Sequence, residues 1–327
     1  MNEKRKIVLV GCGFVGMSMA YSFLNTGGID ELVLIDVDQE KAIGEAMDLQ
    51  HGLPYARGKM SIKAGGYEEC RDAAVVVITA GVTQKPTETR LDLTARDTVI
   101  MKSVTEQIMA SGFDGILVIA SNPVDAMTYV AQKVSGLPTE RVIGSGTILD
   151  TARLRYMMSE YLDVSTSNIH AYIMGEHGDS SFVPWTNAYV GCKNLLDLLD
   201  EKGRDLSDLH DIYTNVQQAG YEIVKRKRST YYGIGLSLNR LVHAILDDEN
   251  VILTVSAYQN NEYGQEGLYI GVPAVVNRQG IREIVKLDLN EVDQAKFNQS
   301  CETIRDINTC LLYTSDATDD LTRGDLG

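Results

Sequence analysis

Short runs of apolar residues, rich in branched side chains, recur through the first half of the chain without alternating with polar residues. Runs of this kind, bounded by Gly or Asp, are typical of strands that are buried on both faces of a parallel sheet. The segments between them are long enough to be crossover helices. The pattern predicts strands at residues 7–10, 32–35, 75–79, 116–120 and 142–143, with helices at 14–26, 39–50 and 93–111.

The second half has a different pattern. Helical periods cover residues 147–162, 206–228 and 231–247, and three strand candidates follow at 251–258, 268–276 and 280–287, before a closing helix at 291–308. We therefore predict an α/β fold with two domains: an N-terminal Rossmann domain with a doubly wound parallel sheet (1–145) and a C-terminal mixed α+β substrate domain with antiparallel strands (146–309). Residues 310–327, rich in Asp, Thr and Ser, are predicted to be a disordered or non-native tail.

Composition narrows the class of protein. The 327 residues are 44% hydrophobic and 23% charged, which is ordinary for a globular protein. The formal net charge of −15 argues against a nucleic-acid partner, because phosphates would be repelled at long range. We find no apolar run long enough for a signal peptide or a membrane span, and the five cysteines form neither a CxxC motif nor a zinc-like cluster. These observations predict a reduced, cytoplasmic protein without a metal.

A glycine-rich loop, Gly11-Cys12-Gly13-Phe14-Val15-Gly16, lies between the first predicted strand and the first predicted helix. Glycines at this spacing let a pyrophosphate approach the amides at the helix N-terminus, where the helix dipole favours negative charge. Asp36 ends the second strand, where a carboxylate accepts hydrogen bonds from ribose hydroxyls and repels a 2′-phosphate. The sequence therefore predicts NAD rather than NADP, and the alternative is a set of glycines that only tighten the turn.

Three polar side chains suggest an acid/base site. His177 lies in the polar, Gly-flanked loop 175–179, and a histidine can exchange a proton near neutral pH. Asp150 could orient the imidazole and raise its proton affinity. Arg153 follows three residues later on nearly the same helix face, and its guanidinium can bind a carboxylate through two hydrogen bonds. Oxidation of a 2-hydroxy acid needs these groups, although Asp150 and Arg153 could also be an exposed helix pair.

Several stretches together resemble the L-lactate dehydrogenases of the lactate/malate dehydrogenase superfamily, over residues 6–308. The matching stretches are 11–16, 34–36, 44–49, 84–86, 88–91, 121–125, 150–153, 175–179 and 230–233. The resemblance implies that His177 is the acid/base, Asp150 its orienting partner and Arg153 the anchor of the substrate carboxylate. It also places Arg90 on a mobile lid that stabilises charge on the substrate carbonyl.

The same resemblance assigns further contacts. Asn122 is expected to contact the substrate and the nicotinamide, and Thr230 to form part of the pocket wall. It also implies that the partners are pyruvate or lactate and further copies of the chain in a homotetramer. The residues that match the cofactor groove are Gly11, Gly13, Val15, Gly16, Asp36, Lys41, Tyr67, Gly81, Val82, Ser103, Ala120, Ser121, Asn122 and Ser145.

Substrate choice depends on Gln84, because malate dehydrogenases of this superfamily carry an arginine there. A second substrate carboxylate buried beside a neutral amide would be unfavourable, so Gln84 favours an uncharged side group such as the methyl of pyruvate. Longer aliphatic 2-oxo acids are harder to exclude. Thr87 replaces the usual glycine of the lid, which could stiffen its closure. The remaining alternatives are a malate or branched-chain 2-hydroxy-acid dehydrogenase and a non-catalytic NAD-binding protein.

An effector site is also implied. Arg155 and His170 match positions that bind fructose 1,6-bisphosphate at a subunit interface in allosteric bacterial relatives. Cationic side chains that face each other across a two-fold axis could hold its two phosphates. The alternative is an exposed helix arginine and a histidine packed near a strand.

Overall fold

The computed structural model describes residues 5–81 and 90–323, with the backbone alone for 90–93, 310 and 312–323. Its first half contains six parallel strands in the order β3-β2-β1-β4-β5-β6, which is the Rossmann order. The strands are β1 (Lys6–Val10), β2 (Glu31–Ile35), β3 (Ser61–Ala64), β4 (Val75–Ile78), β5 (Ile116–Ile119) and β6 (Val142–Gly144). The predicted fold class is confirmed.

The two faces of the parallel sheet pack into different hydrophobic cores. Ile7 and Leu9 of β1 join the core formed with α1 (Phe14–Thr26), α2 (Gln39–Gly52) and α8 (Tyr232–Leu246). Val8 and Val10 join the opposite core, formed with α3 (Arg90–Ala110) and α4 (Val124–Ser135). Both sets of side chains are buried, which explains why the strands appear in the sequence as unbroken apolar runs.

The antiparallel strands of the second half do not form a sheet of their own. They are β10 (Val251–Asn260), β11 (Glu266–Asn277) and β12 (Gly280–Ile284), and β10 pairs with β6 through Ser256 and Gly144 to give one nine-stranded sheet. A Cβ atom at Gly144 would lie 2.6 Å from the Cβ of Ser256, so this pairing requires glycine. A small sheet of two-residue strands, β7 (Ile169–His170), β8 (Tyr189–Val190) and β9 (Lys193–Asn194), was not predicted.

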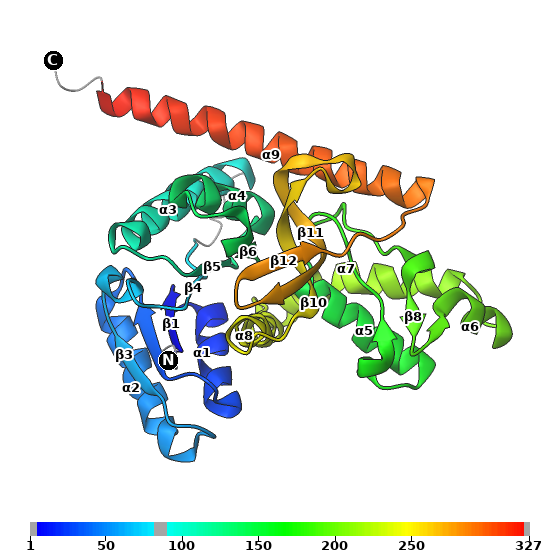
Figure 1. Ribbon diagram of the computed structural model, residues 1–327, viewed down its shortest axis with the longest axis horizontal. Helices are drawn as coiled ribbons and strands as arrows, with labels where there is room; N and C mark the ends of the chain where they lie inside the picture. Colours follow the sequence, from blue (N-terminus) through cyan, green and yellow to red (C-terminus); the bar gives the residue numbers. More distant parts are fainter. Residues whose placement is uncertain (1–4, 82–89, 324–327) are drawn as a thin grey trace.

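The remaining helices surround this framework (Figure 1). They are α5 (Ile148–Leu162), α6 (Leu195–Glu201), α7 (Ser207–Lys227) and α9 (Glu291–Arg323). In Figure 1 the parallel strands with α1 and α2 lie at one end of the molecule, and α5, α6 and β8 lie at the other. In the described parts of the chain, no helix combines the length and apolar character that crossing a bilayer requires.

Helix α9 is longer than the sequence pattern suggested. We expected a helix that ends at residue 308, whereas α9 continues to Arg323, and its far end projects beyond the rest of the molecule (Figure 1). The segment contains no Gly or Pro before Gly324, so nothing in it interrupts a helix. Leu311 still packs in the core shared with α3 and α4. The non-native origin of the tail stays a prediction.

Candidate active site

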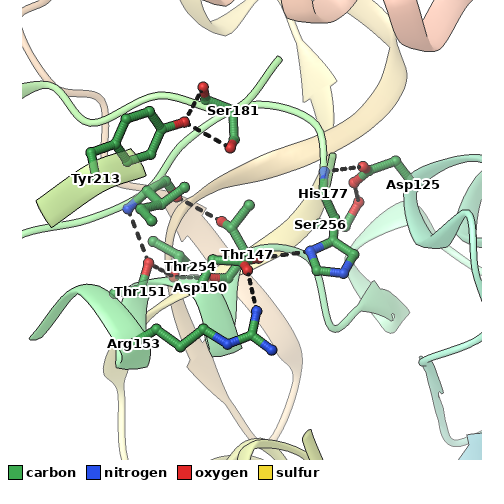
Figure 2. A network of polar contacts seen from close by, with 11 residues as sticks. Asp125, Thr147, Asp150, Thr151, Arg153, His177, Ser181, Tyr213, Thr254 and Ser256 are labelled. Atoms are coloured by element: carbon green, nitrogen blue, oxygen red, sulfur yellow. Dashed lines mark hydrogen bonds and ion pairs between the residues drawn. The ribbon is translucent and has the colours of Figure 1, made fainter. Parts of the chain in front are cut away.

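The structure brings His177, Asp150 and Arg153 together (Figure 2). Nδ1 of His177 lies 2.7 Å from Oδ2 of Asp150, and Nη1 of Arg153 donates to Oδ1 of Asp150 over 2.9 Å. Asp150 is in the first turn of α5, and Arg153 follows one turn later on the same side of that helix. One carboxylate therefore holds both cationic groups, and the alternative of an exposed helix pair is wrong because both side chains are only 17% exposed.

The charges of this cluster favour a proton on the imidazole. Burial opposes protonation of His177, but the hydrogen bond and the charge of Asp150 outweigh it and raise the pKa of His177 above 6.5. Burial likewise works against the ionised form of Asp150, but the hydrogen bond from His177 and the charges of His177 and Arg153 lower its pKa below 3.8. The imidazole ring is 29% exposed, and Nδ1 is the nitrogen directed at Asp150. Nε2 is therefore the atom suited to exchange a proton with a ligand.

Three consecutive backbone N–H groups fix the loop that carries His177. The N–H of Gly175 donates to the carbonyl oxygen of Gly271 on β11 (2.9 Å), and that of Glu176 donates to Oγ of Ser300 on α9 (2.7 Å). The N–H of His177 donates to Oδ2 of Asp125 in the first turn of α4 (2.9 Å). Loops are usually the mobile parts of a fold, but this one is attached to three separate elements.

Asp125 is the residue that the sequence reasoning missed. It lies in the matching stretch 121–125, yet we assigned it no role, because its significance depends on a contact with His177, which is 52 positions away. The only available signal was a carboxylate beside Asn122 at the end of a buried strand. Asp125 is 3% exposed, and its other oxygen accepts a hydrogen bond from Ser256 on β10 (Figure 2).

The glycine loop after β1 is suited to a dinucleotide. Gly11 has φ = 105°, and a Cβ atom there would lie 2.7 Å from the backbone nitrogen of Ala80, while one at Gly16 would lie 2.3 Å from the carbonyl oxygen of Gly11. Gly13, the N-cap of α1, differs from these two: its Cβ position has no protein atom within 4 Å. The loop thus presents the amides of the helix N-terminus without side chains, as binding of a pyrophosphate requires.

Asp36 is attached to this loop. Its Oδ2 accepts the N–H of Cys12 over 2.7 Å, and its Oδ1 accepts the N–H of Asp38 over 3.0 Å. Each carboxylate oxygen can accept a second hydrogen bond, so Asp36 keeps the capacity to bind ribose hydroxyls. The residues present therefore fit NAD, which would supply the hydride acceptor and donor when bound.

Most other residues predicted to line the groove follow the carboxyl ends of parallel strands. Gly81 follows β4, Ala120 to Asn122 follow β5, and Ser145 follows β6. These ends meet at one edge of the sheet, next to the point where the strand order reverses between β1 and β4. Ser121 also donates to the carbonyl oxygen of Ala80, which links two of these loops.

The rest of the predicted groove lies on helices and turns. Val15 is in the first turn of α1, Lys41 and Ser103 are exposed on α2 and α3, and Tyr67 is half-buried in a short helical turn. Their contacts with the cofactor stay predictions.

Some predicted residues cannot be placed. Val82, Gln84 and Thr87 lie outside the described residues, and Arg90 is the first residue of α3, described by its backbone alone. Thr230, by contrast, is described by the structure, and it is half-buried between α7 and α8.

The predicted effector residues lie on neighbouring elements. Nε of Arg155, on α5, donates to the carbonyl oxygen of Ala171 over 3.1 Å, and its guanidinium lies 5.0 Å from the ring centroid of Tyr172. His170 is exposed on β7, beside Ala171.

Known proteins resemble this chain over both halves. Residues 5–144 match the family model described as lactate/malate dehydrogenase, NAD binding domain, and residues 147–312 match that described as lactate/malate dehydrogenase, alpha/beta C-terminal domain. L-lactate dehydrogenase 2 of Bacillus cereus is 53% identical over 302 residues, which cover 92% of this chain and 96% of that protein. L-lactate dehydrogenase of Geobacillus stearothermophilus is 49% identical over 307 residues, covering 94% and 97%.

Solved structures of lactate dehydrogenases are also similar to this chain. A lactate dehydrogenase from a Medee basin deep-sea metagenome library superposes with a TM-score of 0.93 at 53% identity, covering 95% of this chain and all of that one. The minor L-lactate dehydrogenase of Enterococcus mundtii in its ligands-bound form gives 0.92 at 47% identity, covering 94% and 98%. The predicted resemblance is confirmed, and the chain is an NAD-dependent oxidoreductase with an NAD-binding N-terminal half. The chain belongs to the lactate/malate dehydrogenase family.

Proposed function

We propose that this chain is an L-lactate dehydrogenase, which transfers a hydride reversibly between NADH and pyruvate and yields L-lactate. The observation that carries the proposal is the contact of 2.7 Å between His177 and Asp150, with Arg153 on the same carboxylate. Support for its placement beside the cofactor comes from Asp125, which binds the N–H of His177 and lies three residues after Asn122 at the carboxyl edge of the sheet.

His177 acts as the acid in this scheme. In the reduction of pyruvate, the carbonyl carbon accepts a hydride and the carbonyl oxygen accepts the proton of Nε2, so that the ring becomes neutral. The carboxylate of Asp150 stabilises the imidazolium before this transfer and keeps the ring oriented. In the reverse direction the neutral ring removes the hydroxyl proton of lactate.

The other polar residues hold the substrate. Arg153 binds its carboxylate through charge-assisted hydrogen bonds, and Asn122 contacts the substrate on the nicotinamide side. We assign to Arg90 the stabilisation of negative charge that develops on the carbonyl oxygen, and to Thr230 a place in the pocket wall. Gln84 selects a substrate without a second carboxylate.

We further propose a cytoplasmic homotetramer that responds to fructose 1,6-bisphosphate. Support for association comes from the exposed apolar side chains of α2 (Ile43 and Met47) and of α8 (Leu236), since such surfaces are commonly covered by partner subunits. Support for the effector comes from Arg155, whose guanidinium is positioned by Ala171 and Tyr172 next to the exposed His170.

A steady-state assay tests these proposals. The purified chain is given NADH with pyruvate, oxaloacetate or 2-oxoisocaproate, with and without fructose 1,6-bisphosphate, and its mass is measured by light scattering. We expect the highest kcat/KM with pyruvate and loss of turnover in the variant His177→Ala, with its affinity for NADH retained. Binding of NADH without oxidation by any 2-oxo acid would instead identify a non-catalytic NAD-binding protein.

A further inference from the structure

Phe14 is an exposed aromatic residue at a position where the scheme above requires none. It is the first residue of α1, directly after Gly13, and its side chain is 71% exposed. Backbone amides bind a pyrophosphate at such a loop, so the side chain at this position is free for another contact. The ring of Phe14 stacks on that of Tyr231, with centroids 5.2 Å apart and planes inclined by 28°. This is an arrangement that aromatic pairs favour.

The partner ring is next to the wall expected for the substrate pocket. Tyr231 directly follows Thr230 and is the N-cap of α8. The stack therefore joins the residue beside the dinucleotide loop to the residue beside the pocket wall. The two rings come from different halves of the chain.

The ring of Tyr231 has further contacts that restrict its movement. Nζ of Lys227, the last residue of α7, lies 3.4 Å from the ring centroid of Tyr231 and 4.2 Å from that of Tyr232. The two tyrosine rings meet edge to face, with centroids 4.4 Å apart. A cation is attracted to the faces of aromatic rings, so Lys227 helps to keep both tyrosines in place.

Two glycines hold the start of α8 against its neighbours. A Cβ atom at Gly235 would lie 2.6 Å from the Cβ of Ser18 on α1, and one at Gly233 would lie 2.9 Å from Cδ1 of Leu149. Leu149 directly precedes Asp150 on α5. The start of α8 thus packs closely against the helix that begins at the dinucleotide loop and against the helix that carries Asp150. It has little freedom to shift, so the position of the segment that leads into it depends on the stack.

The strength of the stack suits a link between two binding sites. A favourable pair of aromatic rings changes an equilibrium by roughly twofold to tenfold. Such a contact is too weak to determine the fold. It is strong enough to change the affinity for a ligand measurably.

We propose that the stack of Phe14 on Tyr231 couples the two binding sites: when the dinucleotide holds the loop beside Phe14, the stack fixes Thr230 in the position in which the 2-oxo acid binds. Phe14 and Tyr231 are thus positioning residues for the substrate. The inference rests on the proposed function, because it requires NADH and pyruvate in these sites. Coupling between ligands is reciprocal, so bound substrate strengthens the binding of NADH through the same contact.

The affinity for oxamate measures this coupling. Oxamate has the shape of pyruvate, but an amino group replaces the methyl group and its carbonyl accepts no hydride. With saturating NADH, Tyr231→Ala and Phe14→Ala should each weaken oxamate binding by about fivefold to tenfold. KM for pyruvate should rise by a similar factor, while kcat and the affinity for NADH alone change by less than about twofold. The strengthening of NADH binding by a fixed concentration of oxamate should fall in both variants.

A double-mutant cycle separates coupling from a general loss of packing. The double variant Phe14→Ala/Tyr231→Ala should bind oxamate no more weakly than the weaker single variant, because both substitutions remove the same contact. Tyr231→Phe keeps the ring and should retain the affinity for oxamate. Tyr21→Ala removes another exposed ring from α1 and is the matched control, so it should also retain that affinity.

Three results would overturn the coupling: unchanged oxamate affinity in Tyr231→Ala, losses that add in the double variant, or a full loss in Tyr231→Phe. In each of these cases the unsubstituted chain would still reduce pyruvate, so the proposed function would stand. If the unsubstituted chain neither reduces pyruvate nor binds oxamate in the presence of NADH, the proposed function and the coupling are both wrong.

Discussion

Asp36 accepts the backbone N–H of Cys12 over 2.7 Å, so the acid at the end of β2 and the glycine loop at the end of β1 form one unit. The side chain expected to bind the ribose therefore also fixes the loop expected to bind the pyrophosphate. We therefore expect cofactor choice and cofactor affinity to depend on the same carboxylate.

The variant Asp36→Ser should bind NADH more weakly and discriminate less against NADPH. Loss of a charged acceptor of hydrogen bonds costs about 1.5–3 kcal/mol, which corresponds to roughly tenfold or more in affinity. Removal of the negative charge also removes the repulsion of a 2′-phosphate. Titration of cofactor fluorescence with NADH and NADPH measures both effects. The variant Asp38→Ser, at an exposed position nearby, serves as control, and an unchanged ratio of the two affinities in Asp36→Ser would contradict the assignment.

Gly13 and Gly16 should respond differently to alanine. At Gly16 the added Cβ atom would meet the carbonyl oxygen of Gly11 at 2.3 Å, so Gly16→Ala should lower the free energy of unfolding by about 1–3 kcal/mol even without cofactor. At Gly13 the Cβ atom meets no protein atom within 4 Å, so Gly13→Ala should keep its Tm and lose affinity for NADH. Thermal unfolding and NADH titration of both variants make the comparison. Tight NADH binding by Gly13→Ala would place the pyrophosphate elsewhere.

The variant Gln84→Arg should change the preferred substrate. An arginine at position 84 supplies the positive partner that the second carboxylate of oxaloacetate needs in a closed site. We expect the ratio of kcat/KM for oxaloacetate to that for pyruvate to rise by at least about tenfold, which corresponds to about 1.4 kcal/mol. The variant Gln84→Met, which adds no charge, is the matched control. Equal ratios in all three proteins would exclude position 84 as the determinant of selectivity.

The ion pair of His177 and Asp150 should stabilise the fold within a defined pH window. Burial works against the charged form of each group, but their mutual hydrogen bond and charges raise the pKa of His177 above 6.5 and lower the pKa of Asp150 below 3.8. The contribution of His177 is fully present below pH 6.5 and is lost as the pH rises through its folded pKa. The contribution of Asp150 is present above pH 3.8 and is lost as the pH falls through its folded pKa.

The difference in Tm between the unsubstituted protein and His177→Gln should therefore be largest between about pH 4 and pH 6.5. Within that window we expect a difference of about 3 °C or more, since a charged hydrogen bond contributes about 1.5–3 kcal/mol. The contribution of Asp125 to stability changes with pH in the opposite direction to that of Asp150. The pKa of Asp125 is raised to about 6, so its contribution is present at low pH and is lost as the pH rises through 6. The pH dependence due to Asp125 is present both in the unsubstituted protein and in His177→Gln, so it largely cancels in the difference between their Tm values. A Tm difference that grows steadily above pH 7 would be incompatible with a protonated His177.

The interior strands of the parallel sheet could be predicted from the sequence because both of their faces are buried. Val8 and Leu9 pack into opposite cores, so neither face needs a polar residue. Strand β3 could not be predicted, because in Ser61–Ala64 at the sheet edge only Ile62 is buried. The pairing of β10 with β6 was also missed, since it depends on close contact between Ser256 and Gly144, far apart in the chain.

The chemical groups of the site could be predicted from the sequence by residue type. The residues that hold these groups in place could not. A histidine, an acid and an arginine are sufficient to suggest proton transfer and carboxylate binding, and the structure brings all three together. The backbone contacts from Asp125 and Ser300 have no signature in the sequence, because any carboxylate or hydroxyl could supply them. Their identity follows only from the folded arrangement of α4, α9 and the loop between them.

The hydroxyl of Ser300 makes the last helix part of the active-site framework. The supports of the His177 loop come from positions 125, 271 and 300, so the loop can be completed only after nearly the whole polypeptide has been synthesised. The parallel strands, by contrast, all precede position 145, although one face of their sheet is covered by α8. Truncation within α9 would therefore remove a support of the His177 loop without removing any strand of the dinucleotide-binding sheet.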